Sequence, residues 1–419
     1  VEVWKTKRIL WNTFNFGGNN TTSEDQLKID VGAYNPLLGL SYGEVAANSR
    51  SMHKSQGFGS ARQRGESIEY FKLLKGEPAT TDVFEGVNNS WKRLPIASDM
   101  ESTLHSIISN FNPQQPELSL PALETVYSKL QQLDEKDPNV RYWKQQKLTA
   151  CKELILQCAG LWMEAYASNY SAVPGSEISI LAQIIARNPS NVKLKSVSFL
   201  GQTDKKMDLQ LTKNKLEMID QKEILPASTP YSAPYWLNEP HTVGMYTVNN
   251  RALNGTPENH AAKSVIYHLT IDGIDLDVER GLVFKSTDPV KGEVYRPFEV
   301  LPPVTINLSD QVLVFSALTP KEVSFVVKAN TQSVKGTVKV AVPSGWKIEI
   351  KNPEINLAKK GDEQIVKAVL TPDKNGKDGK LRASVLIDGS EYTKSITRIE
   401  YDHIPYQFFL SDAEAKIVF

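Results

Sequence analysis

The chain has 419 residues, and its 48 acidic and 48 basic side chains give a formal net charge of zero at neutral pH. A balanced chain has no overall field that would attract nucleic acid or an anionic membrane, so we expect neither partner. No run of about 18 apolar residues is present, which argues against a transmembrane helix. The length predicts about three domains rather than one hydrophobic core.

Residues 1–80 combine strand-like and helical patterns, which is typical of an α/β fold. Ser41 and Glu44 have the spacing of a capping box and predict the start of a helix. At 100° per residue, His53 falls on the apolar stripe of that helix, so we expect an inward-facing imidazole. Gln56, three residues further on, is its expected hydrogen-bond partner.

Residues 96–170 have apolar side chains at spacings of three and four and are predicted to be a helical segment. Its three predicted helices are MESTLHSIISNF, LPALETVYSKLQQLD and RYWKQQKLTACKELILQCAGLWMEAY. Cys151 and Cys158 lie seven residues apart in the last of them. A rise of about 1.5 Å per residue separates their Cα atoms by about 10 Å, too far for a disulfide, so we predict two free core thiols.

Alternating segments with turn residues between them follow, and they predict two antiparallel β-sandwiches. The first covers 173–303 and includes the predicted strand VGMYTVNN; the second covers 304–408 and is predicted to be immunoglobulin-like, with a turn at DKNG. Residues 409–419 read as the start of a further strand or a linker without a partner. The fold class is therefore multidomain α+β.

Local motifs for metal or nucleotide chemistry are missing from the sequence. None of the six histidines has the spacing of a metal site, and no nucleophile elbow or phosphate-binding loop is present. His260 and His268 would share a face only in a continuous strand, and turn residues between them argue against a metal pair. Asp275 and Asp277 are expected in an ordinary hairpin. We predict no metal ligands in this chain.

The segment YGEVAANSRSMHKSQ resembles the C-terminal helix of LmbE-like (PIG-L family) zinc-dependent N-deacetylases. RILWNTFNFGG, RQRGESIEYF and LKGEP, followed by PYWL, GMYTV and DPVKGEVYRPFEV, resemble a multidomain form of that family from Bacteroidetes-like bacteria. The resemblance covers nearly the whole chain. It implies that residues 1–80 are the C-terminal portion of an α/β deacetylase domain and that the remaining domains are accessory.

In that family an H-P-D-D motif supplies two metal ligands and the base, and zinc activates water for attack on an N-acetylated sugar. This sequence has no H-P-D-D. The resemblance therefore implies a catalytically incomplete chain that binds no zinc alone and needs an upstream deacetylase segment. His53 and Gln56 would support the active-site wall, and Arg62 and Arg64 would reach a substrate phosphate or carboxylate. For the two arginines, a solvated loop is an equally good interpretation. The family implies a periplasmic or extracellular location.

Aromatic residues of the first predicted sandwich offer a second kind of site. Sugar rings pack their CH groups on aromatic faces, so a cluster of aromatic residues here would form a surface that binds a sugar. The alternative is that the same residues form the core of the sandwich. The cluster consists of Tyr231, Tyr235, Trp236 and Tyr246.

Three functions follow from these patterns. The first is the accessory portion of a metal-dependent N-deacetylase acting on N-acetylated sugars or glycoconjugates. The second is a non-catalytic carbohydrate-binding protein, in which the sandwiches hold a glycan. The third is a scaffold in which the sandwiches are spacers without a ligand.

Overall fold

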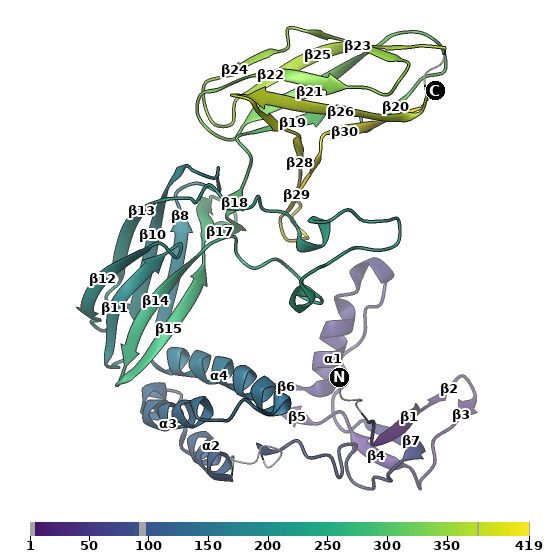
Figure 1. Cartoon of the computed structure of the whole chain (residues 1–419). Coiled ribbons are helices and arrows are strands. Elements are labelled where there is room, and N and C mark those ends of the chain that lie inside the picture. The colour runs from purple at the N-terminus through teal and green to yellow at the C-terminus, as the bar shows by residue number, and fades with distance from the viewer. Residues whose placement is uncertain (1–4, 92–97, 375–376, 419) are drawn as a thin grey trace. The chain divides into compact units, whose positions relative to one another are not determined.

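The computed structural model describes residues 5–91, 98–374 and 377–418. The chain divides into two compact units, Val1–Ser102 and Thr103–Phe419, and most of its regular structure is β-strand (Figure 1). The two units are described in turn.

The first unit contains a three-stranded antiparallel sheet and one α-helix. The order in the sheet is β1 (Arg8–Thr13), β7 (Ile68–Gly76) and β4 (Leu27–Asp30). Two small hairpins pair β2 (Asn15–Phe16) with β3 (Asn19–Asn20) and β5 (Tyr34–Asn35) with β6 (Leu40–Ser41). Helix α1 (Tyr42–Ser51) follows, and a short 3-10 turn spans Lys54–Gln56.

Three helices precede the sandwiches, as predicted. They are α2 (Ser98–Asn110), α3 (Leu120–Gln131) and α4 (Pro138–Cys158), with a 3-10 turn at Pro116–Ser119. Cys151 and Cys158 are buried free thiols, as expected, and burial raises the pKa of Cys151 to about 11.

The last helix is shorter than the sequence pattern suggested. The predicted helix continued through LWMEAY, but α4 ends at Cys158 and those residues begin strand β8 (Leu161–Ala167). Gly160, at φ +65°, ends the helix, and a Cβ at this position would lie 2.7 Å from the backbone nitrogen of Asn188. The left-handed conformation and the close approach both require glycine here.

The first sandwich is made of two sheets whose strands pair mainly in the antiparallel sense and that pack against each other. One has the order β13 (Glu217–Ile224), β10 (Glu177–Ala186), β8, β16 (Val283–Asp288) and β17 (Gly292–Pro297); the other has the order β12 (Thr203–Gln210), β11 (Val192–Phe199), β14 (Ser264–Ile271) and β15 (Ile274–Gly281). The only parallel contact described in these sheets joins β16 to β8. The hydroxyl of the fully buried Tyr267 donates to the carbonyl of Glu164, 2.6 Å away, and so links the two sheets.

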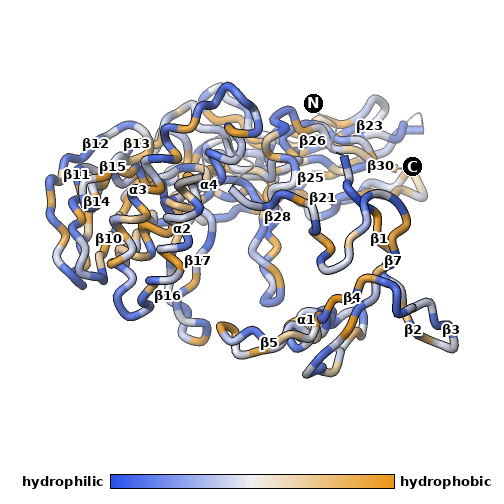
Figure 2. Tube along the Cα trace, turned by 90° about the horizontal axis from the view of Figure 1, so that it is seen from below, coloured by the Kyte–Doolittle hydropathy of each residue, from blue (hydrophilic) through white to orange (hydrophobic). Residues whose placement is uncertain are grey.

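The second sandwich has a separate core, and a two-sheet sandwich was predicted here. One sheet has the order β19 (Val304–Leu308), β21 (Lys321–Ala329), β25 (Glu363–Pro372) and β23 (Trp346–Lys351). The other contains β20 (Val312–Val314), β30 (Glu414–Val418), β26 (Gly379–Ile387), β22 (Val334–Ala341) and β24 (Glu354–Leu357), with β27 (Ser390–Tyr392) paired to β26. Hydrophobic and hydrophilic residues alternate along the strands (Figure 2), as sandwiches require.

Two sequence predictions about strands are corrected. Residues 409–419 were expected to start a strand without a partner, but β30 pairs with both β26 and β20, and β29 (Gln407–Asp412) pairs with β28 (Lys394–Ile399). VGMYTVNN forms no strand; it lies in an irregular segment, residues 225–263, whose regular structure is limited to the 3-10 turns Tyr235–Leu237 and Arg251–Leu253. Asn375 and Gly376 of the predicted turn lie outside the described residues.

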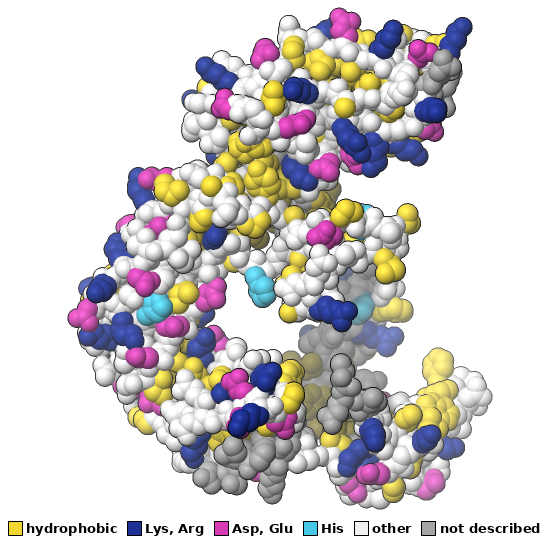
Figure 3. All heavy atoms as spheres, viewed as in Figure 1, with side chains coloured by type: hydrophobic (Ala, Val, Ile, Leu, Met, Phe, Trp, Pro, Cys, Tyr) yellow, Lys and Arg dark blue, Asp and Glu magenta, His cyan; other side chains and the backbone are white. Residues whose placement is uncertain are grey.

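Lys, Arg, Asp and Glu side chains are interspersed over the face seen in Figure 3, in keeping with the balanced composition. Within the described residues, no helix has the length and apolar character needed to cross a membrane.

Candidate functional site

The two sandwiches of the second unit are joined by a short and buried connection. Strand β18 (Glu299–Val300) pairs in parallel with β9 (Ser171–Ala172), and the chain then enters the second sandwich through Leu301 and two prolines. Leu301 is fully buried. The side chain of Asn330 donates to the carbonyl of Pro302, 2.9 Å away, and fixes this connection to the second sandwich.

A buried carboxylate lies at this junction. Glu299 is 0% exposed, and its two oxygens accept from Arg296 at 2.9 Å and from Arg398 at 3.0 Å. The hydroxyl of Tyr406 also donates to Glu299, and burial together with this hydrogen bond raises the pKa of Tyr406 to about 12. Arg398 and Tyr406 belong to the β28–β29 hairpin of the second sandwich, so Glu299 binds the two sandwiches together.

More cations than anions gather at the junction. The ring of Tyr170 lies 4.6 Å from the guanidinium of Arg296 and 5.0 Å from the ammonium of Lys360. Lys360 also donates to the carbonyl of Ser171. Burial lowers the pKa of Lys360, the charge of Glu299 opposes that effect, and the charge of Arg398 reinforces it. Lys360 is therefore a partly desolvated ammonium beside a carboxylate that two arginines already neutralise.

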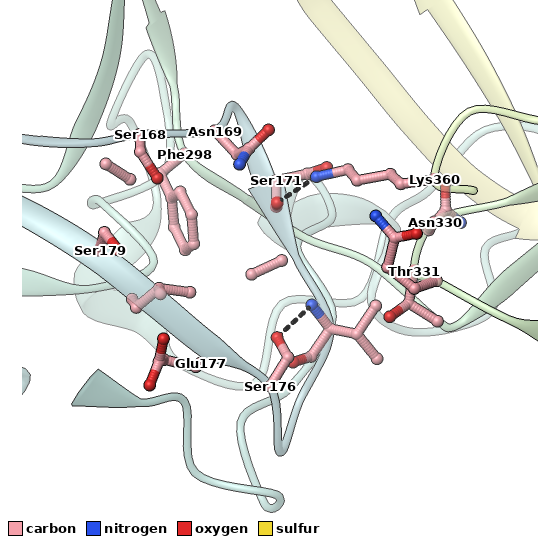
Figure 4. A pocket seen from close by; sticks show the side chains of 15 residues that line it. Ser168, Asn169, Ser171, Ser176, Glu177, Ser179, Phe298, Asn330, Thr331 and Lys360 are labelled. Atoms are coloured by element: carbon pink, nitrogen blue, oxygen red, sulfur yellow. Dashed lines mark hydrogen bonds between the residues drawn. The ribbon is translucent and has the colours of Figure 1, made fainter. Parts of the chain in front are cut away.

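A polar pocket of about 280 Å³ opens next to this cluster (Figure 4). Its side chains come from both sandwiches, and hydroxyls and carboxamides predominate. Those with a polar group are Ser168, Asn169, Ser171, Ser176, Glu177, Ser179, Asn330, Thr331, Gln332 and Lys360. Its volume is just below the range of about 300–1,000 Å³ typical of small-molecule sites, so it fits a group the size of one sugar ring.

The outer face of the five-stranded sheet adjoins this pocket. Strand register places Trp162 and Tyr166 on the solvent side of β8, because Met163 and Ala165 between them point into the core. On the same face Lys285 pairs with Glu164, and its ammonium lies 4.5 Å from the ring centroid of Tyr166.

A second cavity, of about 590 Å³, lies on this face. Tyr166 and Leu181 supply its ring and aliphatic surface, and Asp220 and Lys222 supply charge. Ser168 and Ser179 line both this cavity and the junction pocket. Ser168 and Ser179 therefore lie beside both hollows, near the ends of β8 and β10, and the surface from the Tyr166 ring past these serines to the junction pocket is called the path below.

A serine–histidine–aspartate chain lies on the other sheet of the first sandwich. Ser198 Oγ is 2.7 Å from His268 Nε2, and His268 Nδ1 is 2.6 Å from Asp277 Oδ1. The Ser198 hydroxyl also donates to Asp204, so its single proton is directed away from the imidazole. Neither cavity described above includes these residues. The chain joins four neighbouring strands and has the role of a cross-strand ladder.

The structure corrects the predicted burial of His53. The capping box is present, with the Glu44 N–H donating to Ser41 Oγ at 3.3 Å, but α1 ends at Ser51. His53 lies beyond the helix and is exposed, so the helical stripe does not continue to it. The expected partnership is present, since His53 Nδ1 is 3.0 Å from Gln56 Oε1.

Arg62 and Arg64 are held by helix α1. Arg62 donates to Asn48 Oδ1 at 2.9 Å, and Arg64 lies 2.8 Å from Glu44. The N–H of Ser41 and the charge of Arg64 lower the pKa of Glu44, against the effect of burial. Both arginines thus attach the following loop to the helix.

The four predicted aromatic residues are not sandwich core. Tyr235 and Trp236 form an edge-to-face pair with centroids 4.9 Å apart, whereas Tyr246 is 57% exposed and lies against His241. Tyr231 is 37% exposed. The structure brings together one pair of the four and leaves Tyr246 with a different partner.

Among the described residues there is no group of three or more His, Cys, Asp or Glu side chains that could hold a metal ion. The junction residues Glu299, Arg398 and Lys360 carried no local sequence signal, because their partners are distant in the chain. The Glu299–Arg398 contact spans 99 positions.

No family model matches the chain, and no curated protein matches it. Similar solved structures include a protein of unknown function from Porphyromonas gingivalis W83 (10% identity, 62% of this chain and 100% of that chain, TM-score 0.16) and a chimeric titin Z1Z2 tandem (6%, 61% and 95%, 0.17). Activated Escherichia coli alpha-2-macroglobulin is another (8%, 62% and 33%, 0.20). Because these TM-scores are far below 0.5, the fold and the site rest on strand pairing and contacts alone.

Proposed function

We propose that this chain is a carbohydrate-binding accessory portion of a sugar-processing protein, and that it holds its ligand along the path from the sheet face to the junction pocket. One observation carries the proposal: two cavities of complementary chemistry share Ser168 and Ser179. The Tyr166 ring and Leu181 suit the CH face of a sugar, and the hydroxyls and carboxamides of the pocket suit its hydroxyl groups.

Isothermal titration with a panel of soluble oligosaccharides, neutral and acidic, tests this proposal on the full chain. Ser168 is exposed and lines both cavities, so Ser168→Trp fills the path without disturbing a core. Ser390→Trp, at an exposed serine outside both cavities, is the matched control. We expect binding that Ser168→Trp abolishes and Ser390→Trp retains. Binding of no oligosaccharide, or equal binding by the two variants, would contradict the proposal.

A second proposal concerns residues 1–80, which we infer to be the closing part of an LmbE-like (PIG-L family) deacetylase domain acting on N-acetylated sugars. The capping box of α1 and the His53–Gln56 hydrogen bond in the H-K-S-Q segment support it. It predicts zinc-dependent acetate release only when a segment with the H-P-D-D motif is supplied. Acetate release from N-acetylglucosamine conjugates by residues 1–419 alone would refute it.

A further inference from the structure

We propose that the junction pocket selects a negatively charged sugar residue, whose carboxylate or sulfate group lies against the ammonium of Lys360. This inference rests on the proposed function, since it names the class of glycan taken by the same pocket.

Positive charge exceeds negative charge at the junction. Glu299 is the buried carboxylate of the junction, and three cations surround it: Arg296, Arg398 and Lys360. The two arginines already occupy both Glu299 oxygens. Three cations against one carboxylate leave an excess of two positive charges in a partly desolvated place. An anion in the pocket would offset this excess, and the reduced solvation strengthens the attraction.

A wall of the pocket contains a buried hydroxyl without a hydrogen-bond partner among the described residues. Ser171 is 2% exposed and lines the pocket, and its Oγ makes no hydrogen bond within the described part of the chain. An unpaired buried polar group costs about 1–3 kcal/mol, and a hydrogen bond from Ser171 Oγ to a ligand group at the pocket wall would offset this cost. The Lys360 ammonium already contacts the Ser171 carbonyl, which places both donors at the same wall (Figure 4).

Few other charged side chains line the pocket beside Lys360. Among the described lining residues it is the one cation, and Glu177 is the one carboxylate. Glu177 is paired with Lys222 at 2.8 Å. The other polar lining groups are neutral hydroxyls and carboxamides. A ligand anion therefore has one charged partner, with neutral groups left for the sugar hydroxyls.

Titration of the full chain with size-matched oligosaccharides tests the inference, using a neutral, a uronate-containing and a sulfate-ester ligand. Lys360→Met removes the charge and keeps the length of the side chain, and Lys359→Met is the control at the exposed neighbouring lysine. We expect at least one acidic ligand to bind about tenfold more tightly than the neutral one, and Lys360→Met to remove that preference. The uronate and sulfate arms identify which anion the pocket prefers.

A salt series on the unmodified chain gives a readout that does not depend on the folding of a variant. Affinity for the acidic ligand should fall with added salt, and affinity for the neutral ligand should not. Equal affinity for neutral and acidic sugars, equal effects of the two lysine variants, or acidic binding that survives Ser168→Trp would overturn the inference. Neutral binding lost in Ser168→Trp with no acidic preference would leave the proposed function standing and refute only the charge selection.

Discussion

The loop after helix α1 pairs one arginine with a carboxylate and the junction between the sandwiches pairs two, and the contacts of the two regions differ in distance along the chain and in burial. Arg62 reaches Asn48 across 14 positions, and Arg64 is 65% exposed in its contact with Glu44. At the junction the Arg398–Glu299 contact spans 99 positions, and the Glu299 side chain is fully buried. Contacts between residues near in the chain thus attach a surface loop, whereas the long-range contact holds two domains together beside a pocket.

The largest expected effect is loss of stability on Glu299→Ala. Removing one partner of a buried ion pair leaves Arg296 and Arg398 uncompensated, which typically costs about 3–5 kcal/mol. Urea unfolding of the full chain measures the free energy of unfolding. The control is Glu322→Ala, which removes an exposed, solvent-screened pair with Lys367 and should reduce the free energy of unfolding much less. Equal losses from the two variants would remove the distinction between the junction and ordinary surface pairs.

A smaller loss is expected for Tyr406→Phe. The change deletes one hydrogen bond to the buried Glu299. It keeps the aromatic ring, whose centroid lies 4.1 Å from the guanidinium carbon of Arg296. We expect a loss of about 1–2 kcal/mol in the free energy of unfolding. A loss as large as that of Glu299→Ala would mean that the Tyr406 hydroxyl stabilises the cluster as much as both arginine contacts of Glu299 do, which contradicts the expected ranking.

Ligand affinity at the junction should depend on pH through the protonation of Lys360. Burial lowers the pKa of Lys360 below 10.5, and Glu299, Arg398 and the paired Glu177 are the charged groups near it. Between the lowered pKa and 10.5 the folded chain binds fewer protons than the unfolded chain, so the contribution of Lys360 to stability rises with pH. Affinity for an acidic sugar should move the other way and fall as the pH rises from neutral through the lowered pKa of Lys360, measured by titration calorimetry. Lys360→Met should remove this change, and an unchanged pH profile would show that Lys360 does not contact the ligand.

The smallest effect is expected for His53→Ala. The imidazole is exposed, and its partner Gln56 is three residues away, so the free energy of unfolding should change by less than about 0.5 kcal/mol. A loss above about 2 kcal/mol in thermal or urea unfolding would indicate a buried role that the exposure contradicts.

Sequence reasoning predicted the features that depend on neighbours in the chain. The capping box at Ser41 and Glu44, the two free core cysteines and the two-sheet architecture of the last domain follow from spacing and alternation. It missed the end of α4 at Gly160, because apolar residues continue past the glycine and mimic the helical period. It also placed His53 on a helix that ends two residues earlier.

The charged cluster at the junction could not be predicted from the sequence, for a different reason. Glu299 begins the two-residue strand β18, Lys360 lies in a turn before β25, and Arg398 is on a hairpin, so each is an ordinary charged residue in its local context. Only the pairing of β18 with β9 and the docking of the β28–β29 hairpin bring them together. The prediction of one aromatic cluster was wrong for the opposite reason. Tyr246 and Trp236 are near each other in the sequence, but Tyr246 lies against His241 and Trp236 against Tyr235.

Hydrogen–deuterium exchange of the full chain with and without a bound oligosaccharide tests most directly whether the junction is the ligand site. We expect ligand-dependent protection in peptides covering 168–179, 330–332 and 358–361, because these peptides contain residues that line the pocket. We expect no change in peptides covering 41–66 or 235–246. Protection confined to 235–246 would contradict the account and return the site to the aromatic segment around Trp236.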